Sequence, residues 1–221
     1  MDASAAAPKR RDGKRKRKND PSRTKADILE VAAEEFSTHG LSGARVDAIA
    51  ERTRTSKRMI YYYFQDKETL YRAVLENAYS AVRAIEAKLD LETQPPEAAL
   101  RSLVEQTFEN DDANEAFIRL VAIENIHRGE HLSQLGPIRE INKGVIAIIE
   151  RILARGRAAG AFRADLDAID LHMAISALCF FRVSNKHTFG KIFKIDLTSP
   201  ARRAKHKRMA VEAILRLVRQ E

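Results

Sequence analysis

The segment Lys57–Tyr63 combines positive charge with aromatic hydroxyl groups, which are residue types that contact nucleic acids. Arg58 can donate two hydrogen bonds to guanine, and Met59 can touch the methyl group of thymine. The three tyrosines that end the segment offer hydroxyl groups to phosphate oxygens. Because a helix cannot bury three adjacent residues on one face, at least one or two of these tyrosines must face outward. The segment therefore predicts a contact with DNA.

Glu124, His127 and His131 form a second group, with a spacing typical of metal ligands. On one helix the three side chains can face the same way. However, Gly129 weakens a helix, a neighbouring arginine repels a cation, and the residue order of zinc proteases is absent. We therefore expect no metal ion and no cofactor. The alternatives for this segment are the polar edge of a ligand pocket, because Glu124 continues an apolar stripe that includes Val121, and a solvated helix end.

An enzyme is not expected, because the sequence lacks a Gly-x-Ser-x-Gly elbow, a Walker loop and a dinucleotide fingerprint. His172 precedes the apolar run Met173–Phe181, but the sequence has no nucleophile at a spacing from His172 that indicates a catalytic pair. Cys179, the only cysteine, lies in this run, so no internal disulfide can form and a small buried hydrophobic residue is expected there.

The elements that position Lys57–Tyr63 are expected to be helices. Apolar residues recur with helical spacing across Ile28–Phe36 and predict a supporting helix that ends near Gly40. A short second helix and a three-residue break follow, and then Ser56 and Asp66 can cap a third and a long fourth helix, whose apolar face continues to Leu89. Two short helices joined by a tight turn form a helix-turn-helix, whose second helix fits the major groove of DNA.

The rest of the chain repeats apolar residues with helical spacing and shows no strand of useful length. We predict an all-α fold of about nine helices, with an N-terminal three-helix helix-turn-helix domain and a helical C-terminal ligand-binding and dimerisation domain. The predicted boundaries are a disordered basic arm over residues 1–20, the DNA-binding domain over 21–67 and the C-terminal domain over 68–221. Residues 168–183 are apolar nearly all round, which predicts a helix buried on several sides.

The charge of the chain favours a polyanionic partner. The 221 residues carry a net charge of +8, and residues 1–20 hold eight basic residues against three acidic ones. Such a cluster suits the phosphate backbone, and the alternative is a disordered tail that aids solubility. No signal peptide is visible, and no apolar run approaches the roughly 20 residues that a membrane span needs. We therefore expect a cytoplasmic protein without a membrane partner.

A longer pattern, Thr24–Leu75, resembles the DNA-binding domain of the tetracycline-repressor (TetR) family. The matching residues are Ile28, Leu29, Ala32, Ala33, Phe36, His39, Gly40, Val46, Ile49, Ala50, Ser56, Lys57, Ile60, Tyr61, Phe64, Lys67, Glu68 and Leu70. The resemblance implies a divergent helical body with an inducer pocket, whose last two helices form a four-helix bundle with a partner subunit. It also implies that Tyr61 and Tyr63 contact DNA and that Lys67 holds a phosphate, where the positive end of a helix already attracts anions.

Two features of the sequence depart from the family pattern. Members often carry Thr or Ser where this chain has Ala44 and Arg45, so Arg45 is expected to replace a phosphate contact while the cap of the second helix is weakened. The turn usually contains Gly where this chain has Arg54. A left-handed conformation of Arg54 costs about 1–2 kcal/mol and gains one more cation facing DNA.

We predict a sequence-specific regulator, a ligand-responsive repressor acting as a homodimer on a palindromic operator. The alternatives are a DNA-binding activator or regulator without a small-molecule inducer, and a general nucleic-acid chaperone that acts through the basic tail. The residues expected to contact DNA are Arg45, Arg54, Lys57, Arg58, Met59, Tyr61, Tyr62, Tyr63 and Lys67. The residues expected to line the pocket for a small-molecule effector are Phe108, Phe117, Glu124, His127 and Phe180. Phe180 can equally lie in the dimer interface.

Overall fold

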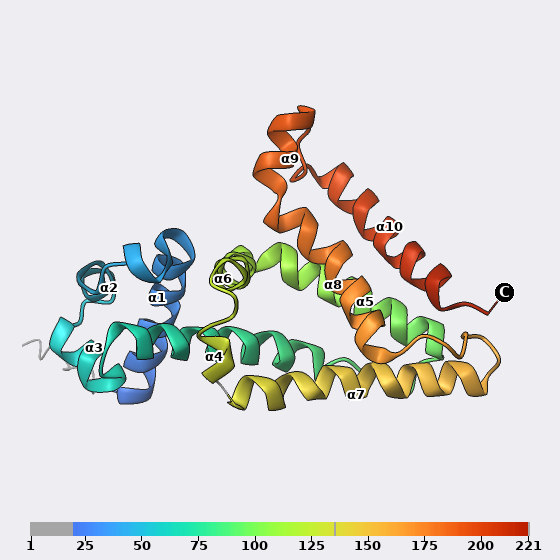
Figure 1. Cartoon of the computed structure of the whole chain (residues 1–221), viewed down its shortest axis with the longest axis horizontal. Coiled ribbons are helices and arrows are strands. Elements are labelled where there is room, and N and C mark those ends of the chain that lie inside the picture. The colour runs from blue at the N-terminus through green and yellow to red at the C-terminus, as the bar shows by residue number, and fades with distance from the viewer. Residues whose placement is uncertain (1–19, 135, 221) are drawn as a thin grey trace, which may run out of the picture.

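The computed structural model describes residues 20–134 and 136–220, so the predicted basic arm, apart from Asp20, lies outside the described residues. The described residues form ten α-helices and one short 3-10 helix, with no β-strand (Figure 1). The elements are α1 (Pro21–Gly43), α2 (Val46–Arg52), α3 (Lys57–Phe64), α4 (Lys67–Glu86), α5 (Pro96–Ala113), α6 (Glu115–Ile126), η1 (Leu132–Gln134), α7 (Gly136–Ala158), α8 (Ala168–Ser184), α9 (Lys186–Phe193) and α10 (Pro200–Val218). The predicted all-α fold is confirmed.

The head of the molecule consists of α1, α2, α3 and the first half of α4, which share one apolar core. Ile28 and Phe36 of α1, Ile49 of α2 and Ile60 of α3 are fully buried in it. Leu70 of α4 is buried in the same core, so α4 joins the head to the rest of the chain (Figure 1). The predicted domain boundary between residues 67 and 68 stays a prediction.

Local sequence signals explain where the helices of the head begin and end. Ser56 Oγ accepts a hydrogen bond from Met59 N at 3.2 Å, and Asp66 Oδ1 accepts one from Thr69 N at 2.7 Å, so both predicted caps are present. Gly40 interrupts α1 with φ 65° and ψ 176°. Because a side chain is strained at this positive φ, a glycine here lets the chain turn toward α2.

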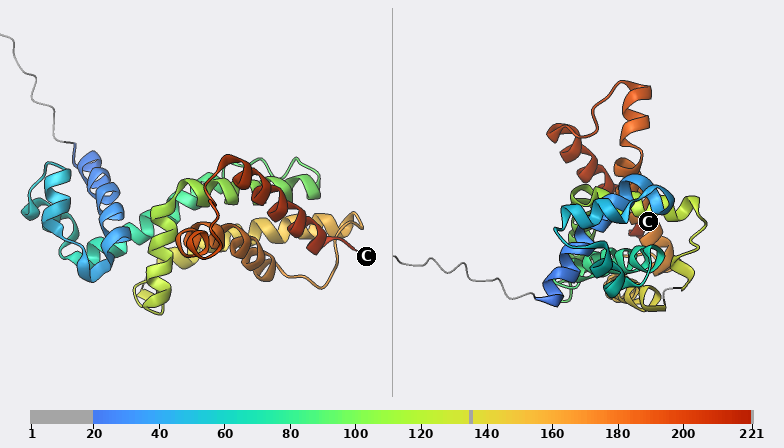
Figure 2. Two further views of the ribbon diagram at one scale, coloured as in Figure 1. Left: turned by 90° about the horizontal axis from the view of Figure 1, so that it is seen from above. Right: turned by 90° about the vertical axis from the view of Figure 1, so that its left-hand side faces the viewer.

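The body consists of the second half of α4 and the helices α5–α10. Its core is built by α5, α7, α8 and α10, and α7 runs beside α4 (Figures 1 and 2). α6 packs against both α1 and α8 and so contacts the head as well as the body. Gly156 lets α7 approach the ring of Phe162 closely, since a Cβ atom at Gly156 would lie 1.9 Å from that ring.

Three details differ from the sequence-based expectations. α9 is a tenth helix, in a stretch to which the sequence assigned no element. α4 ends at Glu86 rather than reaching Leu89, because the chain turns there and brings Leu91 into the core of the body. α8 is not buried on several sides within one chain, since Ile169 and Met173 are 66% and 65% exposed. Among the described helices none is both long and apolar enough to cross a membrane.

Candidate DNA-binding surface and ligand cavity

α3 presents its polar and aromatic residues outward because two apolar residues fix its inner face. Ile60 is fully buried and Phe64 is 2% exposed, as their spacing of four residues predicted. Tyr62 is 76% exposed and Tyr61 37% exposed, so the prediction that at least one or two tyrosines face outward is confirmed. Tyr63 is half-buried and meets the ring of Tyr62 edge to face at 5.4 Å.

Exposed cations surround the tyrosines of α3. Arg45, Arg54 and Arg58 are exposed, and Met59 is half-buried. Lys57 Nζ lies 3.0 Å from Asp47 Oδ2 of α2, and this hydrogen bond raises the pKa of Lys57. These cations and hydroxyl groups match the phosphates and base edges of a DNA groove in charge and in hydrogen-bonding capacity.

The two departures from the family pattern have structural consequences. Arg45 caps α2 without a side-chain hydrogen bond, but its backbone N–H donates to Glu35 Oε1 of α1 at 2.9 Å. A carboxylate from α1 therefore binds the N–H of the cap residue, while the first N–H groups of α2 itself receive no side-chain cap. Arg54 adopts the left-handed conformation with φ 53°, at the turn between α2 and α3.

Lys67 has a role within the head that the sequence did not indicate. Its Nζ donates to the backbone oxygens of Ser42 and Ala44, each at 3.2 Å. These bonds tie the start of α4 to the end of α1 and occupy two of the three donors of the ammonium group. A phosphate contact by Lys67 stays a prediction.

A buried polar network joins the head to the body. Tyr71 Oη donates to Glu124 Oε1 at 2.9 Å, and His131 Nδ1 lies 3.1 Å from the same oxygen. Leu132 N donates to Glu124 Oε2 at 3.3 Å. Glu124 is 1% exposed and faces Tyr71 rather than the cavity described next. His127 is exposed at the end of α6, so neither Glu124 nor His127 lines the cavity, where they were expected from the sequence. The described part of the chain holds no group of three or more potential metal ligands.

A cavity of about 190 Å³ lies inside the body, between α4, α5, α6, α7 and α8. Phe117 and Phe180, two of the residues expected to contact a ligand, line it, and ligand binding by them stays a prediction. Phe108 does not, because it is packed in the core of the body with Arg182 over its ring at 4.7 Å. Tyr79 contributes a third aromatic ring, which meets Phe117 edge to face at 5.1 Å. The cavity therefore offers several aromatic faces in a small volume.

Four ionisable residues also line this cavity, namely Arg83, Glu86, Asp111 and His172. Arg83 and Glu86 form an ion pair. Burial raises the pKa of Glu86, and the positive charge of Arg83 opposes this shift. Burial, followed by the charge of Glu86, raises the pKa of Asp111 to about 7. Burial, followed by the charge of Arg83, lowers the pKa of His172 to about 4, so this imidazole is neutral at pH 7.

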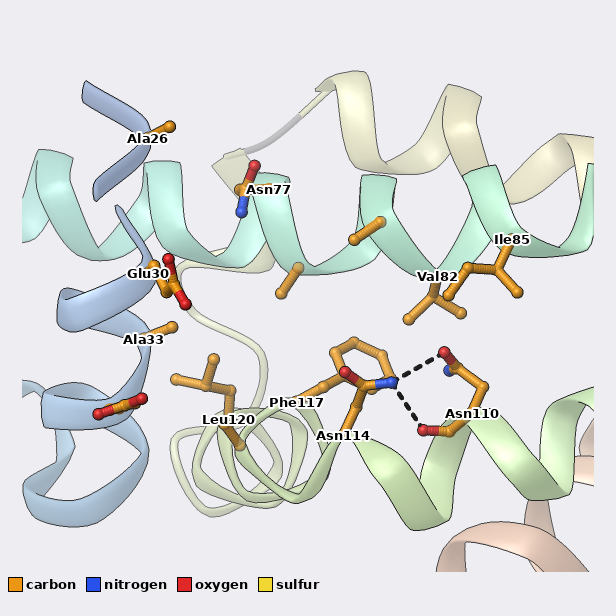
Figure 3. A pocket seen from close by; sticks show the side chains of 14 residues that line it. Ala26, Glu30, Ala33, Asn77, Val82, Ile85, Asn110, Asn114, Phe117 and Leu120 are labelled. Atoms are coloured by element: carbon orange, nitrogen blue, oxygen red, sulfur yellow. Dashed lines mark hydrogen bonds between the residues drawn. The ribbon is translucent and has the colours of Figure 1, made fainter. Parts of the chain in front are cut away.

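An open groove of about 470 Å³ lies on the other side of Phe117, between α1, α4 and the α5–α6 junction (Figure 3). Ala26 and Ala33 line its α1 side, and Val82 lines both the groove and the cavity. Figure 3 shows Asn114 hydrogen-bonded to Asn110, with distances of 2.8 Å from Asn114 Nδ2 to the backbone oxygen and 3.0 Å to Oδ1. The groove thus follows the contact between the head and the body.

Sequence reasoning missed the ionisable residues of the cavity and the Tyr71–Glu124 contact. One signal was available, because Glu86 lies four residues after Val82 and Asp111 three residues after Phe108, on helix faces that are otherwise apolar. A charged residue on such a face is unexpected unless it is paired or functional. The partners come from other helices and are not adjacent in sequence.

Comparisons with known proteins agree with this architecture. Residues 28–74 match the family model of bacterial regulatory proteins of the tetR family, and residues 96–214 match that of the tetracyclin repressor-like C-terminal domain. The chain is 35% identical over 182 residues to the HTH-type transcriptional repressor NicS of Pseudomonas putida, covering 82% of this chain and 86% of the relative.

Solved structures have the same fold. SCO4942 from Streptomyces coelicolor, described as a transcriptional regulator, has a TM-score of 0.65 and 26% identity, over 88% of this chain and 98% of that one. The transcriptional regulator FadR from Bacillus subtilis, in complex with stearoyl-CoA, has a TM-score of 0.66 and 21% identity, over 87% and 98% of the two chains. The relatives are transcriptional regulators and not enzymes. The matched family models and the exposed recognition helix together show that this chain belongs to the TetR family of DNA-binding transcriptional regulators.

Proposed function

We propose that the protein is a ligand-responsive repressor that binds a palindromic operator as a homodimer. The exposed, cationic and tyrosine-bearing face of α3 carries this proposal. Arg58 of each protomer reads a base in the major groove, while Arg45, Arg54 and Tyr62 contact the phosphate backbone. The name of the relative NicS, a transcriptional repressor, supports repression as the regulatory outcome.

Exposed apolar residues at the far side of the body support a homodimer. On α8 these residues are Ile169, Met173, Leu178 and Phe181, and on α10 Met209 is 54% exposed. α8 and α10 lie side by side, so two copies can bury these faces in a four-helix bundle. For such a dimer to bind two half-sites, its two copies of α3 must lie one DNA turn apart, about 34–36 Å.

A small molecule in the cavity can alter the spacing of the recognition helices through α4 and α6. α4 contributes Leu70 to the core of the head and Tyr79 to the cavity. α6 contributes Phe117 to the cavity and packs against α1. A ligand that binds better to one arrangement of these helices shifts the protein toward that arrangement. FadR of Bacillus subtilis, which has the same fold, was solved with stearoyl-CoA. A cavity of about 190 Å³ requires a much smaller ligand here.

A regulator without a small-molecule inducer is the second candidate. The small volume of the cavity favours it, since pockets for drug-sized ligands usually have about 300–1,000 Å³. A screen of metabolites for thermal stabilisation of the protein and for release from DNA distinguishes the two candidates. Release by at least one small molecule supports the ligand-responsive repressor, and DNA binding that no compound alters supports the second candidate.

Selection of genomic DNA fragments on the purified full chain tests the DNA-binding part of the proposal. We expect one palindromic sequence to be enriched and to bind one dimer. Arg58→Ala should lower affinity for this operator by about 10-fold or more while changing affinity for random DNA much less, since a base contact contributes about 1–3 kcal/mol of discrimination. Lys88→Ala, which removes an exposed cation just beyond the far end of α4, is the matched control and should change neither affinity. Equal losses on both DNAs for Arg58→Ala contradict the assigned role.

A further inference from the structure

The cavity in the body has room for a single ring. Its volume is about 190 Å³, and a dry cavity of about 150 Å³ already accommodates benzene. Tyr79, Phe117 and Phe180 present aromatic surface to this space. A flat ring can therefore contact aromatic side chains from α4, α6 and α8.

When Asp111 is ionised, the groups around the cavity carry one negative charge that no unpaired cation in the lining balances. Arg83 and Glu86 pair with each other, so their charges cancel. His172 is neutral, as described above. Arg182 approaches Asp111 from outside the cavity, but it is paired with Asp112 and lies over the ring of Phe108. Asp111 is only 7% exposed and lines the cavity. Because Arg83 is paired with Glu86, no lining residue forms an ion pair with the carboxylate of Asp111.

We propose, on the basis of the ligand-responsive function above, that this cavity binds a single-ring organic cation such as an aromatic amine or amidine. The N–H groups of the cation donate to the carboxylate of Asp111, and its ring contacts Phe117 and Phe180. Aromatic rings add to the attraction, because the face of a ring carries partial negative charge. A cation in the cavity also makes the ionised form of Asp111 favourable despite its burial.

An anion that binds Arg83 is the rival occupant. Arg83 Nε is buried and has no hydrogen-bond partner among the described residues, so it can donate to an acceptor on a ligand. However, an anion at this position brings a further negative charge next to Glu86 and Asp111, which line the same cavity. A neutral acceptor, such as a hydroxyl group on the ring of a cation, satisfies Arg83 without this repulsion.

Benzamidine and benzoate form a suitable pair of probes, because they have the same ring and opposite charges. Binding to the full-length protein at pH 7.5 is measured by calorimetry and by the shift in melting temperature. We expect benzamidine to bind and to raise the melting temperature, while benzoate does neither. Asp111→Asn should weaken benzamidine binding at least 10-fold, and this variant should fold because the replaced carboxyl group is destabilised when ionised. Asp27→Asn, an exposed position on α1, is the matched control and should bind benzamidine like the parent.

Each alternative outcome has a definite meaning. Binding of benzoate in preference to benzamidine overturns the proposed ligand class but leaves a sensory cavity in place. Unchanged benzamidine affinity in Asp111→Asn overturns the assigned contact, and lack of binding by both probes overturns the ligand class. A different result would contradict the ligand-responsive function itself, namely that no compound of the metabolite screen alters binding to the operator.

Discussion

The hydroxyl group of Tyr71 in α4 donates a hydrogen bond of 2.9 Å to Glu124 Oε1 in α6. The Tyr71 ring meets Phe36 of α1 edge to face at 5.0 Å and His131 at 5.1 Å, so one side chain contacts the head and the body. Burial, followed by the hydrogen bond to Glu124, raises the pKa of Tyr71, which keeps its hydroxyl group protonated and able to donate. Any rearrangement of α6 relative to α4 must stretch or break this bond.

Tyr71→Phe should therefore lower the free energy of unfolding by about 1–3 kcal/mol, because the buried carboxylate of Glu124 loses a donor while the ring remains. Denaturation in urea measures this change. Tyr62→Phe removes the same hydroxyl group from a side chain that is 76% exposed, and it should change the stability by less than about 0.5 kcal/mol. Equal effects of the two variants are incompatible with a stabilising role for the Tyr71–Glu124 bond.

Arg54 is expected to reduce stability in exchange for a positive charge near DNA. Its φ of 53° is strained for a residue with a side chain, so Arg54→Gly should raise the free energy of unfolding by up to about 1 kcal/mol, after allowing for the greater backbone freedom of glycine in the unfolded chain. The same variant should bind operator DNA more weakly and with a smaller salt dependence. Thermal melts and titrations at several salt concentrations measure these two effects.

Arg54→Ala separates the two roles of this residue. Alanine removes the charge but retains the strain of positive φ, so the variant should lose DNA affinity like Arg54→Gly and gain no stability. A gain in stability by both variants means that the arginine side chain, rather than the backbone, is destabilising. Unchanged DNA affinity in both variants contradicts the predicted contact of Arg54 with DNA.

The stability of the protein should depend on pH through two groups with opposite effects. The pKa of Asp111 is raised to about 7 from its ordinary value of 3.8, so the folded state retains a proton that the unfolded chain releases, and stability falls as pH rises between these values. The pKa of His172 is lowered to about 4 from its ordinary value of 6.5, so the unfolded chain takes up a proton first and stability falls as pH decreases below 6.5. Between about pH 4 and 6.5, the effects of Asp111 and His172 on the free energy of unfolding therefore have opposite signs.

Asp111→Asn should remove one of these contributions. Relative to the parent, the free energy of unfolding of the variant should rise with pH by about 1.4 kcal/mol per pH unit between the two pKa values of Asp111 and become constant above about pH 7. Urea denaturation at a series of pH values gives this difference, and Asp27→Asn controls for the loss of an exposed aspartate. A constant difference across the whole range contradicts the raised pKa.

Local signals in the sequence were sufficient for the head of the molecule. Ser56 and Asp66 were assigned as caps because such residues bind the first N–H groups of a helix, and Ile60 and Phe64 were placed inside from their spacing. The body was less predictable, because the cavity depends on side chains from five helices and no local rule gives their packing. His127 and Phe108 were expected in the pocket from their residue types, yet one lies at an exposed helix end and the other in the core.

The apolar face of α8 gives the last prediction, which concerns assembly. Phe181 is 51% exposed and lines a groove with Leu178 of α8 and Met209 of α10, which are 42% and 54% exposed. In a homodimer through α8 and α10 these residues are buried, so Phe181→Glu should place an unpaired charge in the interface and produce monomers. Because binding to a palindrome uses two copies of α3, the monomer should also bind the operator at least 10-fold more weakly. Sedimentation and DNA titration measure the two effects.

Ile126→Glu is the matched control, because it introduces the same charge at a residue that is 77% exposed and belongs to α6 rather than to α8 or α10. This variant should remain dimeric and retain its affinity, since an isolated exposed apolar residue needs no partner. If Phe181→Glu and Ile126→Glu are both dimeric, the apolar face of α8 is not the interface. If both are monomeric, the interface includes α6 and the dimer has a different geometry. Only the loss of dimers in Phe181→Glu alone supports α8 as the surface that pairs two copies of the chain.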